Sequence, residues 1–372
     1  MSGPFVKRNH ESSDHESTKS RKLRYLDDSR RLVAIAVLWC AMAGAGAGRA
    51  ASPTPAQSAA GTIALPPAPD IAGVIKGGTR PQLIAAGLMG ADDPIWLPNI
   101  GLVFTEPNAN RIVRLSDADT LSTFVDGLHS PLGMTFDRQG RLISLQSEAG
   151  FTGVRVVWPP GKEATLADRF DGLRFSRPNG VIADSKGGVY LTDPGLSPAQ
   201  EDELRKTQPR LPPAVYYVPA GAAPIRVAEG IARPNGVHLS RDEKTLYVND
   251  TNGLESFAFD VLPDGRLSRR RVFATYAGRT LPLGATAGIA SGADDLVIDN
   301  EGRVYSVTAA GIEVLTDAGR PLGIIPAKCS PDGGRCQALA FGGPDKRTLY
   351  VAGGGTLLRI QMVAQGFTGR AK

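Results

Sequence analysis

The sequence predicts an all-β fold, a six-bladed β-propeller, and three observations support this prediction. The 44 glycines and 28 prolines are spread along the 372 residues, which is typical of many short strands joined by turns. The motif Arg-Pro-Asn-Gly-Val occurs twice, at 177–181 and 233–237, each time followed by a strand, a polar turn and a strand that ends on aspartate. Six segments with this hairpin pattern recur, which indicates propeller blades.

The six predicted blades follow one another along the chain, and each offers three or four short apolar runs separated by turn residues. They start near residues 94, 131, 178, 234, 293 and 337. A strand at 83–85 is expected to pair with the last blade, because closing the ring removes an unpaired edge. A short helix is expected at 197–204, inside an insertion. A β-sandwich of similar strand content is the alternative, and the repeated hairpins favour the propeller.

Residues 1–50 have the pattern of an export signal. A stretch that bears Arg and Lys ends at 29–31, an apolar run follows at 32–39, and small residues from Ala41 to Ala51 offer a cleavage site. The apolar run is too short for a comfortable membrane span, although an uncleaved anchor is an alternative. We therefore expect a periplasmic or secreted protein with no stable membrane anchor after processing. Both general secretory and twin-arginine export fit the pattern.

The predicted domain organisation places a flexible linker rich in Ala and Pro at 51–82, the propeller at 83–365 and a C-terminal tail at 366–372. The formal net charge is +5, and residues 1–50 contribute +4 of it. The remainder is nearly neutral, which argues against a nucleic-acid partner. Cys329 and Cys336 flank a turn, so in an oxidising compartment they are expected to form a disulfide, with free thiols as the alternative.

The inner strands of a propeller line its central channel, and the residues at their starts form a ring around one end of it. Here the ring positions are Asp92 or Asp93, Leu132, Asn179, Asn235, Asp294 and Ala338. Carboxylate and amide oxygens are suitable ligands for a hard cation, so the sequence predicts a site for calcium or another divalent cation. The alternative for the two Asn residues is a structural Pro-Asn-Gly turn, in which Asn tolerates unusual backbone angles. The aspartates of the hairpins are expected to form turns: Asp137, Asp184, Asp242 and Asp299.

At these residues the chain resembles the calcium-dependent propeller family of gluconolactonase, regucalcin and luciferin-regenerating enzyme. The matching stretches include 177–194, 233–251, 294–305 and 340–344. The resemblance implies a propeller that holds one divalent cation and hydrolyses lactones, with relatives that cleave organophosphates. It implies Asn235 and Asp294 as metal ligands, Asp294 as the catalytic acid or base, and Asn179 as a residue of the pocket. Arg177 and Asn179 are the candidate substrate-binding residues. Asn179 is also a candidate ligand.

The chain departs from the family pattern at three of the ring positions. Asp92-Asp93-Pro94 replaces a Glu-Gly-Pro whose Glu binds the metal, which makes Asp92 a shorter candidate ligand. Leu132 and Ala338 stand where relatives carry polar residues, so a less polar pocket is expected. The function expected is an exported, calcium-dependent hydrolase of small lactones or esters. A phosphotriester hydrolase on the same site and a non-catalytic ligand-binding propeller with structural calcium are the alternatives; the sequence leaves the substrate and the oligomeric state open.

Overall fold

The structure is a computed structural model that describes residues 65–148, 150–196, 209–330 and 334–372. The expected export signal at 1–50 and the expected helix at 197–204 lie outside the described residues, as does the first part of the expected linker. Within the described part of the chain, no helix is long and apolar enough to cross a membrane.

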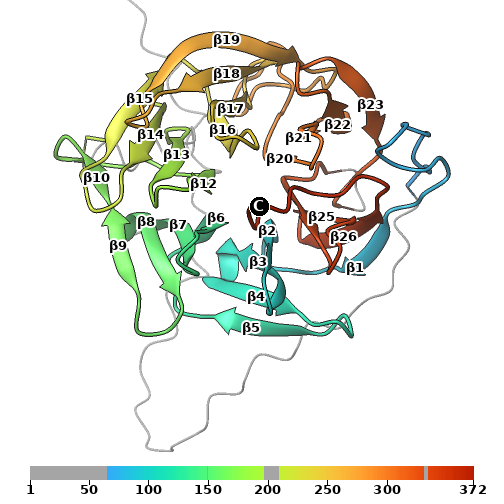
Figure 1. Ribbon diagram of the computed structural model, residues 1–372, viewed down its shortest axis with the longest axis horizontal. Coiled ribbons are helices and arrows are strands. Elements are labelled where there is room, and N and C mark those ends of the chain that lie inside the picture. Colours follow the sequence, from blue (N-terminus) through green and yellow to red (C-terminus); the bar gives the residue numbers. More distant parts are fainter. Residues whose placement is uncertain (1–64, 149, 197–208, 331–333) are drawn as a thin grey trace, which may run out of the picture. The chain divides into compact units, whose positions relative to one another are not determined.

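Six four-stranded antiparallel sheets surround a central axis, which confirms the predicted propeller (Figure 1). In the first five blades the innermost strand comes first in sequence and the outermost comes last. Blade one contains β2 (Asp92–Leu97), β3 (Gly101–Glu106), β4 (Arg111–Leu115) and β5 (Leu121–Val125). Blade two contains β6 (Pro131–Phe136), β7 (Leu142–Glu148), β8 (Phe151–Trp158) and β9 (Ala164–Ala167). Blade three contains β12 (Val181–Ala183), β13 (Val189–Asp193), β14 (Ala214–Val218) and β15 (Ile225–Glu229).

The remaining blades repeat the arrangement, and the last one closes the ring. Blade four contains β16 (Pro234–Leu239), β17 (Thr245–Asp250), β18 (Glu255–Val261) and β19 (Leu267–Thr275). Blade five contains β20 (Leu296–Ile298), β21 (Val304–Thr308), β22 (Gly311–Leu315) and β23 (Pro321–Ile325). Blade six contains β24 (Ala338–Gly342), β25 (Thr348–Gly353) and β26 (Thr356–Gln361), with β1 (Gln82–Ala85) as its outer strand. A short hairpin, β10 (Arg169–Phe170) and β11 (Leu173–Arg174), and a 3-10 turn, η1 (Pro107–Ala109), lie between blade strands.

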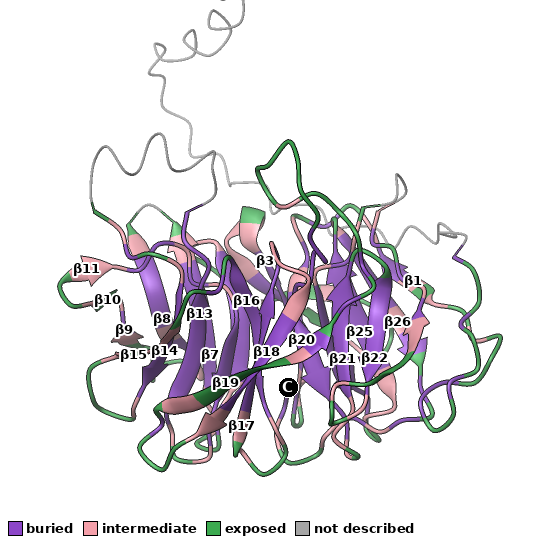
Figure 2. Ribbon diagram, turned by 90° about the horizontal axis from the view of Figure 1, so that it is seen from above, coloured by how far each residue is buried: buried purple, intermediate pink, exposed green. Residues whose placement is uncertain are grey.

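Ring closure is achieved by the pairing of β1 with β26, in which Gln82 lies opposite Arg359. The pairing confirms the closing strand expected at 83–85, covers the edge of β26 and completes blade six with four strands. Apolar side chains fill the space between the blades, with one buried cluster at each of the six blade interfaces. Figure 2 shows the resulting pattern, in which the inner strands are buried, while much of the outer strand β19 and of the connecting turns is exposed. Both faces of most strands are therefore covered, which gives the inner strands rigid positions.

The hairpin aspartates form turns, as expected. Asp137 Oδ1 accepts hydrogen bonds from the backbone N–H of Gln139 and of Arg141, both at 2.9 Å. Asp299 accepts from Glu301 at 2.9 Å and from Arg303 at 3.0 Å in the same way. An aspartate that binds its own backbone two residues on stabilises a tight turn. Asp184 and Asp242 make equivalent bonds, so these four carboxylates are assigned to the hairpins.

Two segments expected to be a linker and a tail are packed against the propeller. From residue 65 onward, the expected linker contributes buried Leu65, Val74 and Ile75 to the cluster between blades five and six. The backbone of Val74 also accepts hydrogen bonds from Val363 and Ala364, at 2.9 and 3.0 Å. The described part of the segment at 51–82 is therefore not a flexible linker. Its apolar residues have no local sequence period, so the sequence does not indicate that they pack into a buried cluster.

Candidate functional site

The ring positions of neighbouring blades contact one another through their backbones. Gly180 and Gly236 follow Asn179 and Asn235, and each glycine lies against the next blade. A Cβ on Gly180 would lie 2.5 Å from the carbonyl oxygen of Asn235, and one on Gly236 would lie 2.4 Å from that of Asp294. Neither Asn has a positive φ, so the glycine is needed for close approach and the Asn is not needed for an unusual backbone angle. The repeated Pro-Asn-Gly therefore joins blades and places three polar ring residues in succession.

Polar side chains on the second strands hold this arrangement. The hydroxyl of Thr192 donates to the carbonyl of Asn235 at 2.6 Å, and the amide of Asn249 donates to that of Asp294 at 2.7 Å. These are hydrogen bonds between blades three and four and between blades four and five. Asp193 at the end of β13 is fully buried and accepts from the backbone N–H of Arg177 at 2.9 Å. It is therefore a support for the loop that carries Arg177.

Asn235 is held with one of its side-chain atoms unpaired. Its Nδ2 donates to the hydroxyl of Thr251 at 2.9 Å, which fixes the orientation of the amide. Its Oδ1 is buried and has no hydrogen-bond partner among the residues that the structure describes. Because a buried polar atom without a partner costs about 1–3 kcal/mol, such an atom in a native site indicates a ligand. An amide oxygen is a suitable ligand for a hard cation.

Asp92 and Asp294 come from blades one and five, and the fold brings them close together. Burial, together with the nearby carboxylates of Asp294 and Asp93, raises the pKa of Asp92 to about 8. Burial also raises the pKa of Asp294, although the guanidinium of Arg335 opposes this effect. Two carboxylates that repel each other in this way, Asp294 buried and Asp92 half-buried, are suited to share a cation.

The donor set therefore fits a divalent cation, with two carboxylates and one amide. Among the described residues, no three His, Cys, Asp or Glu side chains converge on a metal site, so the amide oxygen of Asn235 is needed to complete the set. Asn179 is half-buried, and its backbone N–H donates to the carbonyl of Thr192 at 2.9 Å. No hydrogen bond of its side chain to the other three candidates is found in the described ranges, which leaves it free to contact a ligand. Leu132 and Ala338 are buried and apolar, as expected.

Asp93 adopts a backbone conformation that is uncommon for a residue with a side chain. Its φ is +36°, at the position where the Glu-Gly-Pro pattern has glycine. Its carboxylate accepts a hydrogen bond from the backbone N–H of Met134 in blade two and contacts the ammonium of Lys372. The replacement of Glu-Gly by Asp92-Asp93 therefore does more than shorten a candidate ligand. It also adds the buried carboxylate of Asp93 next to the ring position.

Two arginines near the ring were not predicted as site residues. Arg335 Nη2 lies 3.1 Å from Asp294 Oδ2, with the Arg335 side chain 33% exposed. Arg233 is buried. Burial lowers the pKa of its guanidinium, and the neighbouring guanidinium of Arg177 lowers it as well. The carboxylate of Asp294 opposes both effects. The repeated motif could have indicated Arg233, since it occupies the same motif position as Arg177. No sequence signal indicated Arg335, because its pairing with Asp294 spans two blades.

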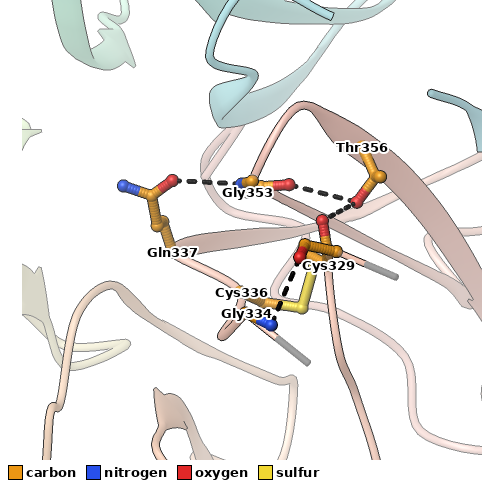
Figure 3. The surroundings of a disulfide bond; sticks show 8 residues. Cys329, Gly334, Cys336, Gln337, Gly353 and Thr356 are labelled. Carbon is orange, nitrogen blue, oxygen red and sulfur yellow. Dashed lines mark hydrogen bonds between the residues drawn. A yellow bond between two sulfur atoms is a disulfide. The ribbon is translucent and has the colours of Figure 1, made fainter. Parts of the chain in front are cut away.

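The predicted disulfide is present and holds the segment that carries Arg335. Cys329 and Cys336 are bonded, with their Cα atoms 4.8 Å apart (Figure 3). The carbonyl of Cys329 accepts from the hydroxyl of Thr356 at 2.6 Å, which attaches this segment to β26. Arg335 directly precedes Cys336, so the cross-link limits where its guanidinium can lie.

Replacing both cysteines with alanine is expected to lower the free energy of unfolding by about 2–3 kcal/mol, the loop-entropy value for so short a loop. Because Arg335 is released as well, the variant is expected to show a weaker effect of Arg335→Met on activity than the parent does. Denaturant unfolding and a rate comparison of the four variants check this. Equal stability of parent and variant would show that the cross-link does not constrain the unfolded chain.

A family model described as the SMP-30/gluconolactonase/LRE-like region matches residues 92–354, which include the whole ring. The chain belongs to this family. The match confirms the resemblance noted from the repeated motif.

Relatives in the SMP-30/gluconolactonase family are similar over most of the chain. A gluconolactonase of Zymomonas mobilis is 24% identical over 316 residues, which are 79% of this chain and 84% of that protein. A lactonase of Staphylococcus saprophyticus is 29% identical over 218 residues, 57% of this chain and 61% of that protein. A solved gluconolactonase from Xanthomonas campestris is 26% identical, with a TM-score of 0.65 and coverage of 80% and 94%. The fold of regucalcin from Agrobacterium tumefaciens, described as a calcium-binding protein, also matches, with a TM-score of 0.60 at 16% identity and coverage of 78% and 96%.

Proposed function

We propose that the protein is an exported, calcium-dependent hydrolase of lactones. The observation that carries the proposal is the unpaired, buried Oδ1 of Asn235 beside Asp294, whose carboxylate and that of Asp92 repel each other. Family membership and the lactonases among the relatives support the reaction class. The export part rests on the signal pattern at 1–50.

Asp92, Asn235 and Asp294 would hold the cation, and Asn179 is the candidate for a fourth oxygen. A divalent cation in this position would supply Lewis-acid polarisation of the ester carbonyl. The three side chains come from blades one, four and five, so the rigid inner strands fix their spacing.

Asp294 is the residue that we assign to proton transfer. Burial raises its pKa, which makes the carboxylate a better proton acceptor for a water molecule than an exposed aspartate is. Arg335, 3.1 Å away, keeps a positive charge beside it and favours the ionised form that can accept the proton. When the lactone ring opens, the same carboxyl can return the proton to the departing alkoxide.

Substrate orientation is assigned to Arg177 and Asn179, which lie on the loop before β12. The backbone of Arg177 is held by Asp193, so its guanidinium extends from a fixed anchor. Leu132 and Ala338 replace polar contacts at two ring positions, and both are buried. We therefore infer a preference for lactones with fewer hydroxyl groups than a sugar lactone carries.

Removal of the metal is expected to abolish hydrolysis. The test measures acid release from a sugar lactone and from an alkyl-substituted lactone, before and after chelation, and then after calcium is added back. We expect the rate to fall at least about 10²-fold on chelation and to return with calcium, with faster turnover of the alkyl lactone. Hydrolysis that persists without metal would contradict the proposal, and calcium-dependent cleavage of a phosphotriester alone would favour the alternative reaction. Calcium binding without hydrolysis of either would indicate a ligand-binding propeller.

A further inference from the structure

The segment that follows β26 enters the axis of the propeller from the end where the hairpin turns lie. Its residues 368–371 form part of the wall of a cavity of about 440 Å³ at that end, together with Asp137, Asp184 and Glu243 of the hairpins. In Figure 1 the C-terminus lies at the centre of the ring of blades. The ring of candidate ligands is at the opposite ends of the inner strands, so this segment approaches the site from below.

Three carbonyl groups of the segment are held by one lysine. Lys346 Nζ donates to the carbonyl of Phe367 at 3.0 Å, of Arg370 at 2.6 Å and of Ala371 at 3.1 Å. The Lys346 side chain thus supplies hydrogen-bond donors to the backbone of a segment that belongs to no strand.

Arg370 adds a second attachment, on blade four. Its Nη1 donates to the carbonyl of Leu239 at 2.8 Å, and its Nη2 lies 3.2 Å from a carboxylate oxygen of Glu243. The predicted tail at 366–372 is therefore a fixed element of the fold.

Lys372 carries the segment to the level of the ring. Its side chain is 1% exposed, its ammonium contacts the carboxylate of Asp93, and it lies 3.1 Å from Asp295 Oδ2. Burial lowers the pKa of Lys372, but Asp295 and Asp93 outweigh this effect and raise it, so the ammonium stays charged. One buried cation therefore joins carboxylates of blade one and blade five, which are separated by blade six.

The two partners of Lys372 directly follow the two acidic candidate ligands. Asp93 follows Asp92, and Asp295 follows Asp294. Asp93 also receives the backbone N–H of Met134, and the N–H of Asp295 donates to the carbonyl of Gln337 at 3.0 Å. A shift of either carboxylate would consequently move the backbone that carries the neighbouring ligand.

Stability alone is a poor reason for such an arrangement. A buried ion pair contributes little net stability, because the desolvation of its charges offsets their attraction. Asp93 in addition keeps a positive φ of +36°, which costs free energy for a residue with a Cβ. Strain and buried charge that persist beside a candidate site indicate a role in that site.

We propose that Lys372 is a positioning residue: its ammonium clamps Asp93 to Asp295 and so sets the spacing of Asp92 and Asp294 for a divalent cation. This inference rests on the metal site of the proposed function. The ammonium does not touch the cation or the substrate; it acts through the residues next to the ligands, as groups behind metal ligands commonly do.

The test removes the clamp without changing the net charge. In the double variant Lys372→Met/Asp93→Asn, one positive and one negative charge are lost together, so the net charge beside the candidate ligands stays the same. Asparagine tolerates positive φ and retains an oxygen for Met134. The matched control is Lys244→Met/Asp242→Asn, which removes an exposed pair, 3.8 Å apart, on a hairpin turn. Calcium affinity is measured by titration calorimetry at a temperature at which circular dichroism shows every variant to be folded.

The double variant is expected to bind calcium about 10–100-fold more weakly, the usual effect of losing an outer partner of a metal ligand, while the control keeps the parent affinity. Parent affinity in the double variant, or an equal loss in the control, would overturn the inference. If the double variant does not fold, Asp93→Asn alone weakens the same clamp and is expected to lose affinity by a few-fold; an unchanged value would overturn it equally. A parent protein that binds no calcium would instead refute the metal site of the proposed function, and the positioning role with it.

Discussion

Asp294→Asn is expected to lower lactone hydrolysis at least about 10²-fold, the low end of the effect of losing a general base. The substitution keeps the shape of the side chain and removes both its charge and its proton acceptor. It also breaks the ion pair with Arg335, at 3.1 Å, and leaves that guanidinium without its carboxylate. Calcium affinity is expected to fall as well, because one of two acidic ligands becomes neutral. Initial rates and calcium titrations measure the two effects separately.

Two further variants show which part of the effect belongs to the metal. Asn235→Ala removes the unpaired Oδ1 and leaves every carboxylate in place, so its lost activity should return in part with excess calcium. Asp294→Asn should stay impaired at saturating calcium, because the proton acceptor is still missing. Asp242→Asn is the control, since its carboxylate is exposed and binds its own hairpin. Full activity and full calcium affinity in Asp294→Asn would remove this ring from consideration as the active site.

Calcium affinity is expected to rise by about tenfold per pH unit from pH 6 until it levels off near pH 8. Asp92 causes this dependence, because burial and the neighbouring Asp294 and Asp93 raise its pKa to about 8 in the metal-free protein. Below that pH the ion must displace a proton to bind. Titrations at half-unit steps from pH 6 to pH 9 measure the slope, and proton release measured in two buffers of different ionisation enthalpy checks its cause.

The same group determines how the stability of the metal-free protein depends on pH. Folding raises the pKa of Asp92 above its ordinary value of 3.8, so the folded protein binds the proton more tightly than the unfolded chain does. The contribution of Asp92 to stability is therefore complete below about pH 4 and is lost as the pH rises through 8. The melting temperature of the metal-free protein should fall between pH 5 and pH 8, and saturating calcium should reverse the fall. A calcium affinity that is constant from pH 6 to pH 8 would mean that Asp92 is already ionised without metal.

The sequence by itself determined the blades. Their hairpins are local: Asp137, Asp184 and Asp299 bind backbone N–H groups within four residues, and a turn of this kind leaves its aspartate and glycine at fixed spacing. The closing strand at 83–85 followed from the need to cover an edge, and the disulfide from the short turn between its cysteines. The ring positions Asp92, Asn179, Asn235 and Asp294 followed from the same repeat, because equivalent positions in equivalent blades must lie around one axis.

Only the tertiary structure decided what lies beside and below those positions. Arg335 reaches Asp294 from the segment before blade six, and Lys372 reaches Asp93 and Asp295 through a segment with no strand pattern. Residues 65–75 likewise pack between blades five and six without a local period. These contacts join residues that are distant in sequence, and each depends on burial and charge supplied by other blades. A sequence repeat shows which residues are equivalent. It does not show which residues lie within a few ångströms of a buried charge, because those neighbours come together only when the ring of blades closes.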